Sequence, residues 1–395
     1  MARPRQAPKI QILGVARRKR AALMVSTALQ ATVVVVLSLP AHAQPAPNAH
    51  PTGGTVVGGA AAISQNAAGT TINQATARAA INWQSFNVGS QQTVTFNQPS
   101  RTAMALNNVV GPNPSQIAGK INANGQIMLV NQSGVVFYKG SQVNAAGLMV
   151  SAAGITTENF MHGVMKFDQP AHPHARVENQ GTITIRDEGL AALVAPQVAN
   201  SGVITARLGH VVLAGAKTAT LDMYGDGLLS VNVTGQVTQA PDGSTALVTN
   251  TGVIRADGGT VQLTAKAVDG VVQNLVSAGG TISARSIGGK TGAIAINGVG
   301  GSIVVEGQLD ASGSTPDSMG GHIGLLASDT VTVKSGAKIN ASGPAGGGIV
   351  AIGTTLKRAA GGPSVTSART AQKVVIESGA TIAADATVKG HGGRV

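Results

Sequence analysis

The sequence predicts an all-β protein that winds as a parallel β-helix and carries an N-terminal β cap. Three observations favour this fold: turns with Asn and Gly separate short apolar runs, a small apolar unit recurs along the chain, and the composition is aliphatic. Hydrophobic residues reach 43% while aromatic residues are only 2%, and the chain has 53 glycines. Stacked β layers suit aliphatic side chains that superimpose, whereas a compact globule normally uses aromatic rings throughout its interior.

Two Asn-x-x-Gly turns show the pattern most clearly. They occupy residues 122–125 and 131–134, and apolar runs of about one strand length follow them at 127–130 and 135–138. Asn and Gly accept positive φ at tight corners. The segment therefore predicts strands alternating with corners, and the corner residues of interest are Asn122, Asn124, Gly125, Asn131 and Gly134.

A unit consisting of a turn with Gly, then Ile or Leu, and usually Ala, recurs from residue 179 to the C-terminus. Its Ile or Leu positions are spaced 50, 28, 27, 30 and 43 residues apart, so one repeat is near 28 residues and the longer spacings hold insertions. Roughly 22–25 residues per coil would give on the order of 14–16 coils. The irregular spacing keeps a β-sandwich or several hairpin domains as the alternative. The positions are Ile204, Ile254, Ile282, Leu309, Ile339 and Ile382.

Segments within the repeats alternate as strands do. Residues 292–296, 302–306 and 330–334 place apolar side chains at every second position. No run with apolar residues at i, i+3, i+4 and i+7 is long enough to predict a helix with assurance.

Residues 1–43 are predicted to be a signal peptide. A purely basic start precedes an apolar run at 21–40, and the small-residue site at 41–43 places cleavage between Ala43 and Gln44. A membrane anchor is the alternative, because the apolar run approaches spanning length. Cleavage would send the chain through the periplasm to the outside of the cell.

Charge and cysteine content fit an exported chain. Lys and Arg number 28 against 16 Asp and Glu, but seven of the basic residues precede Gln44, which leaves 21 against 16, or +5. The remaining basic residues are scattered, so nucleic-acid binding is not expected. The chain has no cysteine, which is compatible with transit in the unfolded state because no disulfide can form in the periplasm.

Three segments are predicted after the signal peptide, and the aromatic residues of the first are expected to form a cap. Residues 44–157 are predicted to hold the cap and the first coils, residues 158–300 the rest of that β-helix, and residues 301–395 further repeats. The last of these segments is expected to be truncated. Earlier Gly-Gly pairs are followed by an apolar strand, whereas the chain ends two residues after its final Gly-Gly pair. A solenoid end must be covered to protect its strand edges and core. The predicted cap core is Trp83, Phe86 and Phe96.

Residues 81–100 and 105–152 closely resemble the filamentous haemagglutinin N-terminal domain, the secretion domain of two-partner secretion exoproteins. The resemblance continues through residues 159–163, 192–215 and 220–233. It implies a right-handed parallel β-helix with an N-terminal cap. It also implies export of the unfolded chain through a dedicated outer-membrane β-barrel transporter with periplasmic recognition domains.

The resemblance also implies site residues and an activity. The signature turns of the family are similar to Asn-Pro-Asn-Gly; Asn122, Asn124 and Gly125 match the first, and Asn131 and Gly134 match the second. Ala123 stands where proline is frequent, and Gln132 and Ser133 depart from the pattern. These turns are implied to take part in recognition by the transporter. The family includes adhesins and haemagglutinins, which implies a secreted or surface-exposed protein that binds host or neighbouring-cell surfaces.

No catalytic residue, cofactor or metal site is expected, and the protein is not predicted to be an enzyme. The carboxylates are sparse, and His162, His172 and His174 form the only histidine cluster, in a Pro-containing stretch without cysteine. A β-helical carbohydrate-active enzyme is one alternative. An autotransporter passenger is the other, although it would need amphipathic barrel strands, and none precede Val395.

Overall fold

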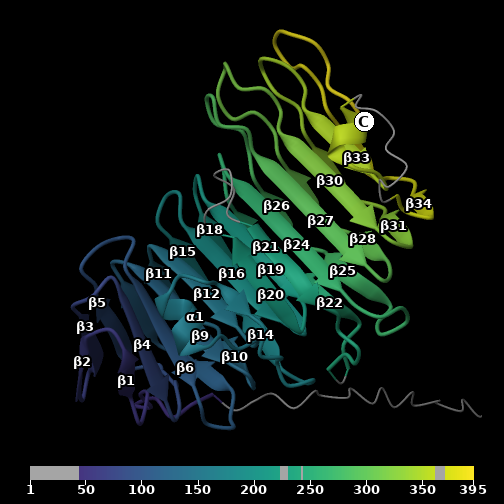
Figure 1. Cartoon of the computed structure of the whole chain (residues 1–395). Coiled ribbons are helices and arrows are strands. Elements are labelled where there is room, and N and C mark those ends of the chain that lie inside the picture. Colours follow the sequence, from purple (N-terminus) through teal and green to yellow (C-terminus); the bar gives the residue numbers. More distant parts are fainter. Residues whose placement is uncertain (1–43, 223–229, 242, 361–369) are drawn as a thin grey trace, which may run out of the picture. The chain divides into compact units, whose positions relative to one another are not determined.

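The computed structural model describes residues 44–222, 230–241, 243–360 and 370–395. The predicted signal peptide through Ala43 lies outside these residues, and Gln44 is exposed at their start. Within them, the chain visits three long sheets in turn, and successive coils stack in sequence order (Figure 1). No helix in the described part is long and apolar enough to cross a membrane.

We name the three sheets I, II and III, and each coil contributes strands in the order I, III, II. Sheet I consists of β1 (Thr55–Gly58), β4 (Arg78–Trp83), β6 (Met104–Val109), β9 (Gln126–Asn131), β12 (Gly147–Ser151), β16 (Leu190–Ala195), β19 (His210–Gly215), β24 (Thr260–Lys266), β27 (Ala293–Val299), β30 (His322–Ala327) and β33 (Ile349–Ile352).

Sheet II consists of β2 (Ala61–Asn66), β3 (Gly69–Gln74), β5 (Thr93–Asn97), β8 (Lys120–Ala123), β11 (Gln142–Ala145), β15 (Thr182–Ile185), β18 (Val203–Ala206), β23 (Val253–Arg255), β26 (Thr281–Ser283), β29 (Gln308–Asp310), β32 (Lys338–Asn340) and β35 (Thr381–Ala383). Sheet III consists of β7 (Ser115–Ile117), β10 (Gly134–Phe137), β14 (Arg176–Asn179), β17 (Gln197–Asn200), β22 (Ala246–Asn250), β25 (Asn274–Ala278), β28 (Ile303–Val305), β31 (Thr330–Val333) and β34 (Lys373–Ile376).

The strands of neighbouring coils pair in parallel, which confirms the predicted right-handed parallel β-helix. The apolar positions of the sequence repeat form one column in sheet II, because Ile204, Ile254 and Ile282 are register partners in succession. The same column continues through Leu309, Ile339 and Ile382. Like side chains therefore lie on like side chains along the core, as the aliphatic composition requires.

The expected 14–16 coils were too many. Sheet II has eleven parallel strands from β3 to β35 among the described residues. Insertions lengthen several coils: β20 (Thr218–Asp222) and β21 (Ser230–Gly235) lie between β18 and β23, and α2 (Leu356–Ala359) lies between β32 and β35. The long spacings of the repeat thus mark insertions, as predicted.

The two helices among the described residues are short and lie in insertions, so the all-β prediction holds. The first, α1 (Thr157–Met161), begins after Thr156, whose hydroxyl accepts a hydrogen bond from the Asn159 N–H at 3.1 Å. Such a cap satisfies one of the unpaired N–H groups of the first turn. In the same way Thr355 caps α2 by accepting from Arg358.

Antiparallel strands cover the N-terminal end of the stack. Strand β1 pairs antiparallel with β4, and β2 pairs antiparallel with β3, whereas parallel pairing starts from β3 and β4 onward. Antiparallel strands in this position occupy the edges that the first coil would otherwise expose.

A ladder of buried asparagines marks one corner of the stack. Asn179 Nδ2 donates to Asn200 Oδ1, and Asn200 Nδ2 donates to Asn250 Oδ1, both at 2.7 Å. All three residues are 0–1% exposed. Since each amide is both donor and acceptor, the ladder satisfies polar groups that would otherwise be buried without partners.

Replacing the middle amide tests this ladder. Asn200→Ala leaves the Asn179 amide donor and the Asn250 oxygen without their partner, so we expect a loss of about 2 kcal/mol in the free energy of unfolding. Urea unfolding followed by circular dichroism measures it. Asn144→Ala is the matched control, because Asn144 is exposed on β11, and its change should stay within about 0.5 kcal/mol. Equal losses in both variants would contradict the role given to the ladder.

Candidate functional site

The first signature turn fastens two coils together. Asn124 is exposed, yet its side chain bonds twice to the backbone of Gln98 in the preceding coil. Its Oδ1 accepts from the Gln98 N–H and its Nδ2 donates to the Gln98 carbonyl, both at 2.7 Å. Asn122 lies on β8 and accepts from Asn144 Nδ2 at 3.2 Å. The Asn side chains of this turn therefore act between coils.

The side chain of Gln98 adds a further hydrogen bond between the same two coils. It is 6% exposed, and its Oε1 accepts from the Gly125 N–H at 3.1 Å. A Cβ atom at Gly125 would lie 2.7 Å from the Ala103 carbonyl oxygen and from Gln98 Oε1, so this corner requires glycine. Gln98 Nε2 also donates to Gln74 Oε1 at 3.1 Å, which extends the network to a third coil.

The second signature turn is buried at its two ends, Asn131 and Gly134. Asn131 is 1% exposed; its Nδ2 donates to the Asn113 carbonyl and to Ser115 Oγ, each at 3.0 Å. Its Oδ1 accepts from the Ser133 N–H at 2.9 Å. Gly134 has φ +104°, and a Cβ there would collide with the Arg176 carbonyl of the next coil. Asn and Gly are thus required here by turn geometry and close stacking.

The three predicted cap aromatics lie next to the antiparallel strands β1 and β2. Trp83, Phe86 and Phe96 are each 1% exposed. Trp83 and Phe86 meet edge to face, with ring centroids 5.5 Å apart. The Trp83 indole N–H donates to Asn107 Oδ1 at 3.0 Å, so its one polar group is satisfied.

The sequence interpretation missed Gln74, Gln98 and Asn107. All three are buried polar residues whose side chains bond to other coils. A signal was present, because Gln74 and Gln98 are 24 residues apart, as are the hydrogen-bonded Asn73 and Asn97. The spacing of one coil places Gln74 and Gln98 in a column, but the sequence repeat is defined by its aliphatic positions and does not include these polar residues.

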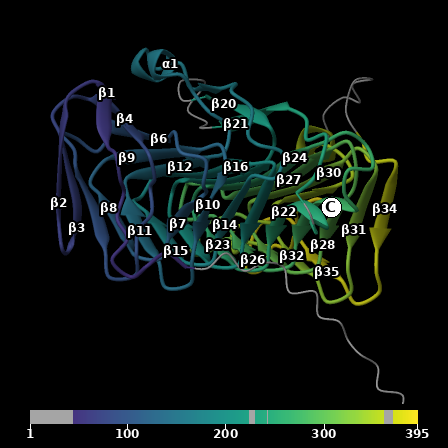
Figure 2. The same cartoon turned by 90° about the horizontal axis from the view of Figure 1, so that it is seen from below.

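A cover lies on the outer face of sheet I. It comprises α1 and the cover sheet, which is β13 (Lys166–Phe167), β20 and β21 in that order. Figure 2 shows α1, β20 and β21 on this side of sheet I. A second apolar cluster fills the space beneath it. The buried members from the cover include Phe160, Phe167, Leu221 and Val231, and those from sheet I include Leu106, Met128, Met149, Val194 and Val212.

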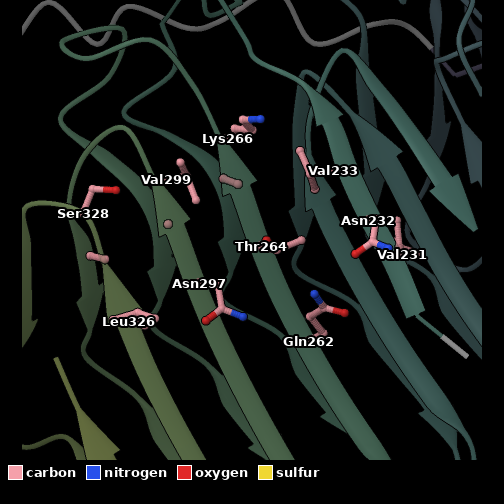
Figure 3. A pocket seen from close by; sticks show the side chains of 13 residues that line it. Val231, Asn232, Val233, Gln262, Thr264, Lys266, Asn297, Val299, Leu326 and Ser328 are labelled. Atoms are coloured by element: carbon pink, nitrogen blue, oxygen red, sulfur yellow. The ribbon is translucent and has the colours of Figure 1, made fainter. Parts of the chain in front are cut away.

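Beyond the cover, a groove of about 240 Å³ lies between β21 and the outer face of sheet I. Strands β24, β27 and β30 form its floor, and β21 borders it (Figure 3). No carboxylate is among its described lining residues. The labelled side chains are Gln262, Thr264 and Lys266 from β24, Asn297 and Val299 from β27, Leu326 from β30, Ser328 directly after β30, and Val231, Asn232 and Val233 from β21.

The titratable groups do not assemble a reactive centre in the described part. Burial lowers the pKa of His210, and the same cause lowers the pKa of His322. Burial opposes ionisation of Asp257, but hydrogen bonds from Arg285 and Ser283 outweigh it and hold the pKa of that carboxyl below its usual value. The described residues contain no group of three or more His, Cys, Asp or Glu placed to hold a metal ion.

The individual histidines and carboxylates have separate surroundings. His162 lies with its Nδ1 at 2.9 Å from the Glu158 carbonyl, and His172 with its Nδ1 at 3.3 Å from Ser133 Oγ. Asp187 pairs with Arg207 at 2.6 Å. Residues 223–229, which include Tyr224 and Asp226, lie outside the described residues.

The Asn124 contact can be tested by truncation. Asn124→Ala removes both bonds to the Gln98 backbone, so we expect the free energy of unfolding to fall by about 2 kcal/mol. Amide hydrogen exchange at Gln98 and Gly125 should speed up in parallel. Asn97→Ala is the matched control, because Asn97 is exposed and meets only Asn73 through its amide. Unchanged exchange at Gln98 in Asn124→Ala would rule out the proposed fastening.

Two known proteins match this chain in sequence. A Heme/hemopexin-binding protein of Haemophilus influenzae (strain Rd) is 33% identical over 224 residues, which are 55% of this chain and 24% of that protein. A second Heme/hemopexin-binding protein of Haemophilus influenzae is 44% identical over 81 residues, 20% of this chain and 9% of that protein. The chain thus matches about a quarter or less of the length of these relatives.

The crystal structure of the HMW1 secretion domain from Haemophilus influenzae superposes with a TM-score of 0.71 at 26% identity, covering 86% of this chain and 84% of that one. Residues 48–311 match the family described as the TPS secretion domain. This match includes the antiparallel strands β1 and β2, both signature turns and the cover sheet. It confirms the resemblance seen in the sequence. The chain therefore belongs to the TPS secretion domain family, the domain by which two-partner secretion exoproteins are exported across the outer membrane by a transporter partner.

Proposed function

We propose that this chain directs its own export from the periplasm to the cell surface and there serves in adhesion. The observation that supports the export mechanism is the uninterrupted parallel register of the coils. In each of the three sheets the strands of a coil pair with those of its two neighbours, so a coil can add as soon as it emerges. The proposed N-terminal signal peptide, cleaved between Ala43 and Gln44, would bring the chain to the periplasm.

Folding outside the cell supplies a driving force for this export. The core columns bury aliphatic side chains at every layer, and burial of apolar surface is the main favourable term in folding. A coil that has joined the stack opposes backward movement of the chain. The antiparallel strands β1 and β2 give the stack a defined beginning. They pair with the strand edges of the first coil, which has no preceding coil.

The signature turns are proposed to contact the transporter before they close. In the folded chain Asn124 is committed to Gln98, and Asn131 is buried with its amide donating to Asn113 and Ser115. These amides become free only when the coils are apart. Recognition of Asn122, Asn124, Gly125, Asn131 and Gly134 therefore suits the extended chain in the periplasm, and their part in recognition stays a prediction.

Adhesion is the proposed role once the chain is outside. Outward positions of sheet II carry polar side chains in register, including Thr95, Asn122, Asn144 and Thr184. Such a polar face suits contact with hydrated host or neighbouring-cell surfaces. Binding of the purified protein to erythrocytes and epithelial cells tests this role; absence of binding would remove adhesion and leave export standing.

A proline in the core column tests the export mechanism. Ile204→Pro removes an N–H from β18 between its partners Ile183 and Ile254, which interrupts stacking at that layer. We expect the amount of protein reaching the surface and medium, in cells that also make the transporter, to fall several-fold. Immunoblots of the medium, surface and periplasm measure the distribution.

The matched control is Asp269→Pro. Asp269 is exposed and precedes Gly270 (φ +81°) in a turn closed by the Val271 N–H to the Val268 carbonyl at 3.4 Å. Proline fits the position before such a glycine. Asp269→Pro should be exported normally. Normal surface yield of Ile204→Pro would refute export coupled to layered folding.

A further inference from the structure

The cover sheet ends at β21, which leaves one strand edge beside the groove. Its order is β13-β20-β21, so within the described residues β21 has a strand partner on one side only. β21 also lies against β24, and the groove extends from there over β27 and β30 (Figure 3). The groove therefore offers a surface on which a fourth strand could lie beside β21.

The backbone of β21 presents hydrogen-bonding groups to this open side. The Leu221 N–H donates to the Met165 carbonyl at 3.0 Å, toward β13. Successive residues of a strand direct their backbone groups to opposite edges, so Thr220 bonds toward its partner Asn232 in β21. The same alternation directs the N–H and C=O groups of Val231 and Val233 away from β20, to the groove.

The groove has polar groups and a positive charge to offer. Among the described residues, no hydrogen bond or ion pair is made by the side chains of Gln262, Lys266 or Asn297. Lys266 is half-buried at one end of the groove. Val299 and Leu326 add apolar surface on the same floor. An unpaired, half-buried cation beside a free strand edge suits an extended chain that carries a carboxylate.

We propose that the groove binds an extended acidic peptide segment of a partner protein, which adds to β21 as a fourth strand. Its backbone would bond to Val231 and Val233, as in other cases of strand addition. Its alternate side chains would meet Val299 and Leu326, and a carboxylate would pair with Lys266. This binding goes beyond export and belongs to the folded protein outside the cell.

Fluorescence anisotropy with the purified secreted protein tests the proposal. The probes are a panel of labelled peptides of about ten residues, with alternating valine and threonine and a pair of glutamates at different alternate positions. At least one should bind, and its glutamine counterpart should bind about tenfold more weakly. Lys266→Glu should weaken the acidic peptide by a similar factor. Lys338→Glu, on exposed sheet II, should leave its affinity unchanged.

The strand edge is tested separately from the charge. Val233→Pro removes an N–H directed to the open side, where proline is tolerated on edge strands, and should abolish binding while the thermal unfolding transition is kept. Methylating alternate backbone nitrogens of the peptide should abolish it without any change to the protein. Failure of every acidic peptide to bind overturns the proposal. So does full binding of the methylated peptides, since charge attraction alone would then explain the effect of Lys266→Glu.

Discussion

Parallel register between successive coils is the constraint on which the structure depends. The backbone of each strand forms hydrogen bonds with the equivalent strands of the preceding and the following coil. Side chains at equivalent positions must therefore stack. In sheet II this produces one aliphatic column from Val94 through Ile204 to Ile382. A one-residue slip would turn that column to solvent. The composition, rich in aliphatic residues and glycine and poor in rings, follows from the same constraint.

Polar residues inside the stack obey the same rule. The amides of Asn179, Asn200 and Asn250 bond to one another along the stack axis. Gln98 bonds to the coils on both sides of it, through Gln74 and Gly125. These amides satisfy buried backbone and side-chain groups at corners, where strand ladders stop. Asn124 and Asn131, whose part in recognition by the transporter is a proposal, also bond within the folded domain. The two roles would apply to different states of the chain.

The insertions add what the repeat lacks. The cover of α1, β13, β20 and β21 buries a second apolar cluster on the outside of sheet I, over coils that include β6, β9 and β12. Where the cover stops, the outward face carries Gln262 and Asn297 beside the edge of β21. The change from apolar to polar outward residues along sheet I follows the extent of the cover. The layered core repeats from coil to coil, while the insertions differ from one coil to the next.

The sequence by itself determined the fold class, the strand alternation, the column of Ile and Leu positions and the family. These are local and periodic properties, and stacking makes each layer repeat the one before it. Only the tertiary structure decided the coil number, the partners of Asn124 and Gln98, and the groove beside β21. Each of these depends on which distant residues an insertion brings together: Met165 and Leu221 meet across the cover sheet, although no repeat relates them. Periodicity specifies neighbours within the stack and carries no information about chain segments that leave it.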